Sequence, residues 1–227
     1  LPQQSVDDAM KDLQQAIDCL PQHISWYQLT IEANTAFYRQ PPTLPNDDIL
    51  ADIQERGNLL LTDNGFAQYE ISAFSKNNQR SLHNLNYWQF GDYLGVGAGA
   101  HGKITDINNG RIIRRQKTRL PDHYLKNAKA PKTKQHTVAT HELNIEFMMN
   151  ALRLIEGVPS DFFEKRTGLA LAEIQDSLTE LQQQQLLAET STHIKTTPLG
   201  QRFLNVVLEK LSAEEKINID GLQTGKQ

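Results

Sequence analysis

Hydrophobic positions recur at helical spacing over the first twenty residues of the chain. Ser5, followed three residues later by Asp8, is typical of a helix start, and Pro21 ends the segment. The apolar stripe between them consists of Val6, Met10, Leu13, Ile17 and Leu20. Residues 24–31 then combine β-branched and aromatic side chains in a nearly continuous apolar run, which predicts a strand covered on both faces.

A second helix and strand follow the first pair. Asn46 is suited to cap the helix, Asn64 and Gly65 to end it, and the stripe between them contains Ile49, Ile53 and Leu60. Residues 66–72 predict the next strand, and residues 92–96 and 111–116 predict two more, the last leaving a turn at 108–110. This order predicts an α/β fold, for which a right-handed parallel arrangement is the default.

The pattern becomes helical after residues 128–137, whose Lys, Pro and polar content is typical of a linker. The elements predicted beyond it are helices from Thr140 to Gly157, over 159–166, over 171–185 and from Thr197 to Leu211, with strand-like segments at 186–190 and 193–197. Three helices, a small β-wing and a helix predict a winged-helix-like module. Its third helix is acidic and Gln-rich, so we expect a structural or protein-contact role and no nucleic-acid binding.

Two domains are therefore expected, residues 1–130 and residues 138–211, followed by a flexible tail at 212–227. Of the 227 residues, 38% are hydrophobic and 22% charged, which excludes a disordered chain, and the apolar runs are too short to span a bilayer. The net charge of −4 gives no general attraction to nucleic acid, although residues 111–119 form a basic island. Cys19 is the single cysteine, which excludes a disulfide framework and fits a reducing, cytosolic compartment.

Residues 83–102, HNLNYWQFGDYLGVGAGAHG, concentrate aromatic residues and glycines as no other part of the chain does. Gly97, Gly99 and Gly102 match the dinucleotide fingerprint, but a hairpin-like segment follows where a helix is required. Two interpretations stay open for the small residues from Gly95 to Ala100: close approach of a flat ligand, or tight packing of backbone against backbone. His141 and Glu142 are explained by a helix start and require no metal.

The first half of this stretch contains His83, Asn84, Tyr87 and Trp88. A neutral imidazole is a good iron ligand, and the flanking aromatics offer a flat apolar surface to a planar macrocycle. Lys76, Arg80 and the basic island are candidates to meet its carboxylates. The alternative is a structural histidine held by hydrogen bonds, and the residue spacing does not decide between the two.

Three segments together resemble one family. HISWYQLTIEANTAFY, GFAQYEISAFSK and LHNLNYWQFGDYLGVGAGAHG are similar, in that order, to the C-terminal half of HemW proteins. These are radical S-adenosylmethionine (SAM) proteins related to HemN, the oxygen-independent coproporphyrinogen III oxidase. The similarity extends from about residue 5 to about residue 211, and HNLNYW matches the His-Asn-x-x-Tyr-Trp motif that distinguishes HemW from HemN and is implicated in haem binding.

The resemblance implies a cytoplasmic haem chaperone, with peripheral membrane contact while it delivers haem to haem-requiring membrane enzymes. Its implied fold is an incomplete (β/α) radical SAM barrel followed by a helical, winged-helix-like domain. Haem would be bound by His83, Asn84, Tyr87 and Trp88, with His83 as the iron ligand. Thr30 and His101 fall on positions that line the SAM pocket of HemN. The alternative activity is that of HemN, oxidative decarboxylation of porphyrinogen propionates by a SAM-derived radical.

The sequence departs from the family in lacking its Cys-x-x-x-Cys-x-x-Cys motif. The chain is therefore expected to be the C-terminal portion of a longer protein, to bind no [4Fe-4S] cluster by itself and to have no radical SAM activity alone. Half a barrel would also leave a sheet edge unpaired, which predicts self-association through that edge.

Overall fold

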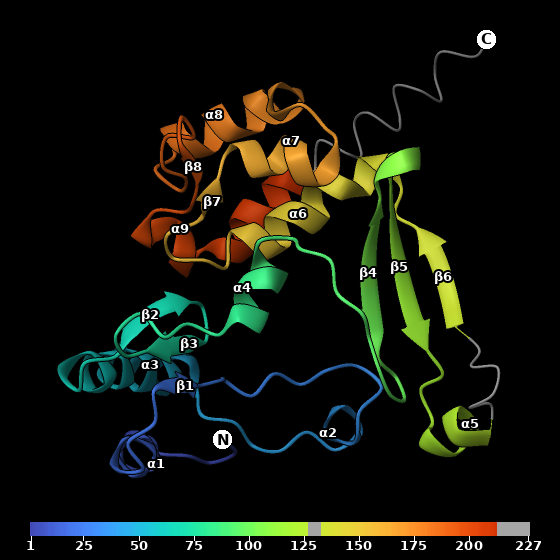
Figure 1. Ribbon diagram of the computed structural model, residues 1–227. Helices are drawn as coiled ribbons and strands as arrows, with labels where there is room; N and C mark the ends of the chain where they lie inside the picture. Colours follow the sequence, from blue (N-terminus) through green and yellow to red (C-terminus); the bar gives the residue numbers. More distant parts are fainter. Residues whose placement is uncertain (127–132, 213–227) are drawn as a thin grey trace. The chain divides into compact units, whose positions relative to one another are not determined.

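A computed structural model describes residues 1–126 and 133–212 of the chain (Figure 1). The chain divides into two compact units, Leu1–Ser81 and Leu82–Gln227. The expected domain boundary between residues 130 and 138 stays a prediction about the longer protein. Within the second unit, the strands before this boundary connect directly with the helices after it, since Arg114 pairs with Glu146. Among the described residues, no helix is long and apolar enough to cross a membrane.

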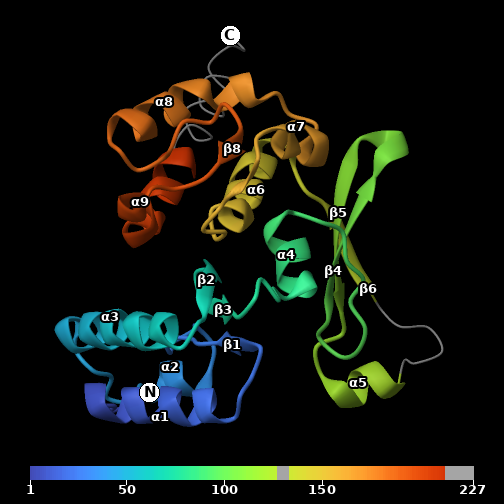
Figure 2. The ribbon, with the colours of Figure 1, turned by 60° about the vertical axis from the view of Figure 1, so that its left-hand side comes forward.

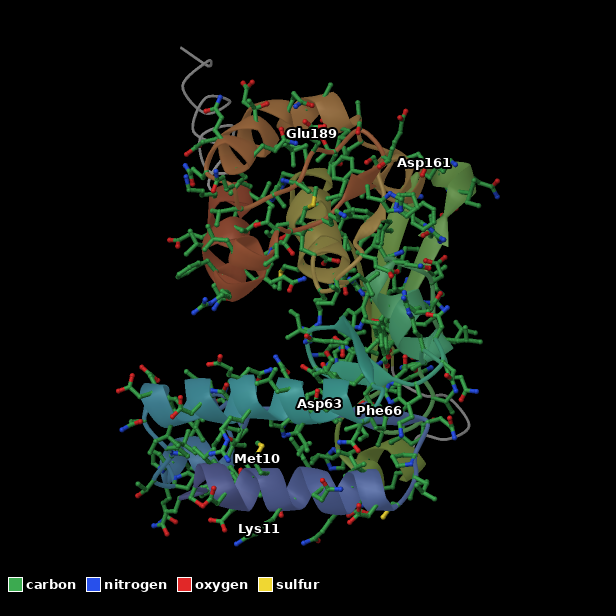
Figure 3. All side chains as sticks on the ribbon, turned by 90° about the vertical axis from the view of Figure 1, so that its left-hand side faces the viewer. Met10, Lys11, Asp63, Phe66, Asp161 and Glu189 are labelled. Carbon is green, nitrogen blue, oxygen red and sulfur yellow. The ribbon has the colours of Figure 1, made fainter. Side chains whose placement is uncertain are left out.

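Two long helices pack against each other in the first unit (Figure 2). The elements of this unit are α1 (Val6–Asp18), β1 (His23–Ser25), α2 (Ala36–Arg39), α3 (Asp47–Asp63), β2 (Ala67–Glu70) and β3 (Ala73–Ser75). The Ser5–Asp8 capping box and the Asn46 cap are both present, which confirms the two predicted helix starts. Figure 3 shows Met10 between α1 and α3 and Lys11 on the opposite side of α1. Met10, Leu13 and Ile17 of the apolar stripe therefore face the core as their spacing predicts. Leu20 does not, because α1 ends at Asp18 and Leu20 is 77% exposed.

The sheet of the first unit has the strand order β1-β3-β2, and both pairings are antiparallel. The predicted parallel pairing is wrong because β3 inserts between the two expected strands, although these two do run in the same direction. The strand predicted over residues 66–72 is confirmed as β2, which ends at Glu70, and β3 follows it after a tight turn. The strand predicted over residues 24–31 ends at Ser25, since the sheet supplies a partner only for this short segment and Tyr27 is exposed.

The second unit begins with α4 (Leu82–Trp88) and a three-stranded antiparallel sheet. Its strands are β4 (His101–Asp106), β5 (Arg111–Lys117) and β6 (Thr133–Thr137), with α5 (Pro121–Lys126) after β5. The hairpin expected after Gly102 is confirmed, and Gly110 takes the left-handed conformation at its turn. The strand predicted over residues 92–96 is wrong: in this segment Tyr93 makes one isolated bridge, to Lys103.

Part of the predicted linker is a strand, β6, which pairs with β5. Its sequence, TKQHT, is polar because the strand lies at the sheet edge, so composition alone gives the wrong prediction. The other expected linker residues, 128–132, lie outside the described residues, and so does the expected tail, of which only residue 212 is described.

The helical part of the second unit has its core around Phe147, Phe163 and Leu178, which are fully buried. Its elements are α6 (Leu143–Ala151), β7 (Val158–Pro159), α7 (Asp161–Thr167), α8 (Gln175–Gln183), β8 (His193–Ile194) and α9 (Pro198–Arg202), with further helix at residues 204–212. The helix predicted to reach Gly157 ends at Ala151 and is preceded by a 3-10 turn. The helix predicted from Thr197 to Leu211 is interrupted at Phe203. The two strand-like segments do meet, at Leu187 and Thr196, but β8 pairs with β7, which the pattern does not predict.

Candidate functional site

His83 and Tyr87 lie one turn apart on the same face of α4. Their ring centroids are 4.6 Å apart, with the planes tilted by 55°. His83 is exposed, and within residues 1–126 and 133–212 its ring makes no hydrogen bond. A histidine that serves the fold through hydrogen bonds needs such partners, so this environment does not support the structural interpretation. With respect to the described residues, the imidazole of His83 is therefore available to bind an incoming ligand through one of its nitrogens.

Tyr87 continues the stack to Tyr93, whose ring lies nearly parallel to it at a centroid distance of 4.2 Å. Burial raises the pKa of Tyr87, and the neighbouring Tyr93 raises it further. The phenol therefore stays protonated at neutral pH and is a poor anionic ligand for iron. Among the aromatic residues of this face, the imidazole of His83 is consequently the group suited to coordinate a metal.

Asn84 and Trp88 occupy a neighbouring face of the same helix, since they are also four residues apart. The guanidinium of Arg153, from the segment after α6, lies 4.3 Å from the centroid of the Trp88 ring. The indole nitrogen of Trp88 is buried and has no hydrogen-bond partner in the described part of the chain. Of the four motif residues, His83 is thus exposed, whereas Asn84, Tyr87 and Trp88 are partly buried.

A buried lysine fixes the segment that carries Tyr93. The ammonium of Lys103, which is 1% exposed, donates hydrogen bonds to the carbonyl of Phe90 at 3.0 Å, to Oδ1 of Asp92 at 2.9 Å and to Oγ1 of Thr105 at 3.3 Å. It also lies 4.2 Å from the centroid of the Phe90 ring. Asp92 accepts two further hydrogen bonds from Thr105, through the backbone N–H and the hydroxyl. This arrangement ties the turn after α4 to β4.

The two charges of this pair are affected differently by burial. Desolvation lowers the pKa of Lys103, against the opposing effect of Asp92. Desolvation also raises the pKa of Asp92, but the hydrogen bonds from Lys103 and Thr105 outweigh it, so that the pKa of this carboxyl lies below its usual value. The sequence does not indicate this pair, because its members are distant along the chain and neither belongs to a motif.

Arg114 connects Tyr93 to the helical part of the second unit. It lies on β5 opposite Lys103 and donates a hydrogen bond from Nη1 to the Tyr93 hydroxyl at 3.2 Å. Its Nε donates to Oε2 of Glu146, on α6, at 3.0 Å. The stack of His83, Tyr87 and Tyr93 therefore rests on a side chain that is itself held at both ends, which makes the site rigid.

The glycines in the second half of residues 83–102 have two different structural roles. At Gly95, an added Cβ would lie 2.0 Å from the carbonyl oxygen of His101, so the tight-packing interpretation holds there. Gly97 and Gly99 have φ values of +101° and +71°, and nothing crowds the position of a Cβ at Gly97. The segment that follows is the β4–β5 hairpin that the sequence predicts.

The residues expected near SAM belong to different units. Thr30 is exposed in the irregular segment after β1, and His101 is exposed at the start of β4, opposite Gln116. Their joint role in a pocket stays a prediction. Cys19 is exposed at the end of α1, and no three His, Cys, Asp or Glu side chains of the described ranges are grouped to hold a metal. A cluster that needs three thiolates does not fit this donor set.

Comparison with known proteins gives consistent matches. The HemN C-terminal domain family matches residues 141–203. The chain is 46% identical to the heme chaperone HemW of Haemophilus influenzae over 95% of this chain and 55% of that protein, and 46% identical to the heme chaperone HemW of Escherichia coli over 94% and 56%. It therefore spans about half the length of these curated relatives.

A solved structure has the same fold. Coproporphyrinogen III oxidase (HemN) from Escherichia coli, described as a radical SAM enzyme, superposes with a TM-score of 0.69 over 93% of this chain and 52% of that chain. The sequence identity is 14%, so this likeness concerns the fold alone.

Proposed function

Because the chain belongs to the HemW family, with 46% identity over 95% of its length, we propose that its protein is a haem chaperone. In this proposal the accessible face of α4 holds haem, and haem-requiring membrane enzymes receive it. The observation that carries the proposal is the exposed His83, whose ring is free of hydrogen bonds among the described residues and lies 4.6 Å from the ring centroid of Tyr87.

The chemistry of this face suits a transient cargo. Imidazole coordinates haem iron, and the stacked rings of Tyr87 and Tyr93 supply an apolar edge for the macrocycle. His83 is at the surface, so bound haem would stay accessible to an acceptor protein. In this account Asn84 and Trp88 position the helix, with Trp88 packed under Arg153.

The remaining features of the family belong to the same proposal. SAM would be bound by the longer protein with Thr30 and His101 at the pocket, and its [4Fe-4S] cluster would be held by cysteines that this chain does not contain. The fold would be the C-terminal half of an incomplete (β/α) barrel followed by a winged-helix-like domain, in keeping with the likeness to HemN. We further propose a cytoplasmic location with peripheral membrane contact during transfer, and self-association through an unpaired sheet edge.

Haemin titration tests the proposed function. The wild-type chain should perturb the Soret band with saturating stoichiometry, and His83→Ala should weaken binding by about ten-fold or more, because the iron loses its imidazole ligand. His193→Ala, which removes an exposed histidine on β8, is the matched control and should bind as the wild type does. Equal binding by all three proteins would contradict the assignment of His83. Formation of protoporphyrinogen by the longer protein would instead favour the oxidase activity.

A further inference from the structure

A group of cations lies at the end of the three-stranded sheet, outside the aromatic stack. Resting on the proposed function, we propose that Lys117, Arg119 and Lys134 form a carboxylate-binding site that takes the propionate groups of the tetrapyrrole. The three side chains come from the end of β5, from the segment after it and from β6. This site would add to the proposed haem binding by contacting the propionate carboxylates along one edge of the macrocycle.

The cations line a cavity. Its volume is about 390 Å³, and the residues around it are Gln116, Lys117, Thr118, Arg119 and Lys134. Every described side chain in this lining is polar, and three of these five are basic. A concave surface with several cations in its lining raises the local concentration of anionic groups and favours their binding over that of neutral ligands.

These three cations have no acidic partners among the described residues. Among the described residues, no carboxylate lies within salt-bridge distance of Lys117, Arg119 or Lys134, and the contact recorded for Lys117 is a 3.3 Å hydrogen bond from its ammonium to the Thr133 hydroxyl. By contrast, Arg114 is paired with Glu146. Cations that the fold does not neutralise can form charge-assisted hydrogen bonds with a carboxylate ligand.

Strand register places part of this cavity on the face of the sheet that carries the aromatic stack. Gln116 lies opposite His101 on one side and opposite Lys134 on the other. Arg114, two residues back along β5, points to the same face and donates to the Tyr93 hydroxyl. Two residues along a strand span about 7 Å, so Gln116 and Lys134 lie one row beyond the residue that holds the stack.

The glycine-rich loop joins the two sites directly. The N–H of Gly99 donates to the carbonyl of Thr118 at 2.8 Å, and the N–H of Lys117 donates to the carbonyl of Ala100 at 2.8 Å. Residues 83–102 thus begin at the proposed iron ligand and end against the cavity lining. One continuous segment with a fixed backbone therefore connects the apolar surface to the cationic one.

The ligand chemistry that fits both surfaces is a flat apolar body with carboxylates on one edge. Lysine and arginine both bind carboxylates, and arginine does so in a bidentate fashion. The porphyrin propionates meet this description. The carboxylate of SAM is the other source of the same chemistry, and the experiment separates the two.

The test uses metal-free protoporphyrin IX and its dimethyl ester, so that it does not depend on iron ligation by His83. Binding is followed by porphyrin fluorescence for the wild type and for the triple variant Lys117→Gln/Arg119→Gln/Lys134→Gln. We expect the triple variant to bind the free acid about ten-fold more weakly and the ester as the wild type does. Lys195→Gln removes an exposed cation directly after β8, outside the basic island and the cavity lining, and should leave both affinities unchanged.

Three results would overturn the proposal. The free acid and the ester could bind the wild type equally well, the triple variant could lose both ligands equally, or the substitutions could weaken SAM binding and leave protoporphyrin binding intact. Failure of the proposed function would give a different result. Bound haemin would then lack an imidazole ligand from His83, while the protein would still bind the free acid more tightly than the ester. Far-UV circular dichroism of the triple variant confirms that the fold is retained.

Discussion

Lys103 and Lys134 lie on the same face of one sheet, yet their surroundings are opposite. Lys103 is 1% exposed, and its ammonium donates to a carbonyl, a carboxylate and a hydroxyl. Lys134 is exposed and has no acidic partner within residues 1–126 and 133–212. The difference separates a cation that the fold requires from one that is free for a ligand.

The physical reason for the contrast is the cost of burial. A buried charge must be paired and hydrogen-bonded, because otherwise its desolvation is not offset. Lys103 meets that condition through Asp92, and in doing so it fixes the chain segment that carries Tyr93. At the other end of the sheet, solvent hydrates Lys134 and no internal partner is needed. Substitutions at the two ends should therefore affect different properties.

The largest effect is expected for Asp92→Asn. It leaves the charge of Lys103 buried without a carboxylate, and the free energy of unfolding of the second unit should fall by about 3 kcal/mol. Urea unfolding measured by Trp88 fluorescence in a Trp26→Phe background reports on this unit alone, since the two tryptophans lie in different units. Glu189→Gln, at an exposed acid of the same unit (Figure 3), is the control and should change stability little. A similar loss for both variants would contradict the account.

A smaller loss, about 1 kcal/mol, is expected for Lys103→Met. Methionine keeps the packing over Phe90, and the remaining Asp92 side chain is 43% exposed and keeps its hydrogen bonds from Thr105. Lys134→Met, the matched substitution on the same face, should stay within about 0.5 kcal/mol of the wild type. The same urea measurement ranks the two variants by their loss of unfolding free energy. An equal loss for Lys134→Met and Lys103→Met would contradict the comparison.

The smallest effect is expected on the free energy of unfolding at acidic pH. Because the pKa of Asp92 is lowered in the folded state, its contribution to stability is present above the ordinary value of 3.8 and is lost as the pH falls through the folded value. Unfolding free energies of the wild type should therefore decrease more steeply below pH 3.8 than those of Asp92→Asn. Parallel pH profiles for the two proteins would show that Asp92 is not a paired carboxylate in solution.

The sequence predicts elements that depend on local signals. The Ser5 capping box, the Asn46 cap and the turn at Gly110 are all encoded by neighbouring residues, and all three are present. Strands that depend on distant partners are predicted poorly. β3 has only three residues and β6 is polar throughout, so neither shows the extended apolar pattern of a covered strand.

The candidate site is predicted in the same uneven way. The motif from His83 to Trp88 is visible in the sequence, but the exposure of His83 and the packing of Trp88 against Arg153 follow only from the structure. Tyr93, Arg114 and the cations around Gln116 come together only through the sheet register. Local patterns in a single sequence do not reveal that register, because it depends on which strands pair in the folded chain.

The central claim is that His83 supplies the iron ligand, and chemical rescue tests it most directly. The ferric complex of the wild type should have the absorption and electron paramagnetic resonance spectra of imidazole-ligated haem, and His83→Ala should lose them. Added imidazole should then restore these spectra in His83→Ala, because the free base replaces the missing side chain on the iron. If haemin bound to His83→Ala instead has the wild-type spectra without added imidazole, another residue binds the iron and the claim is wrong.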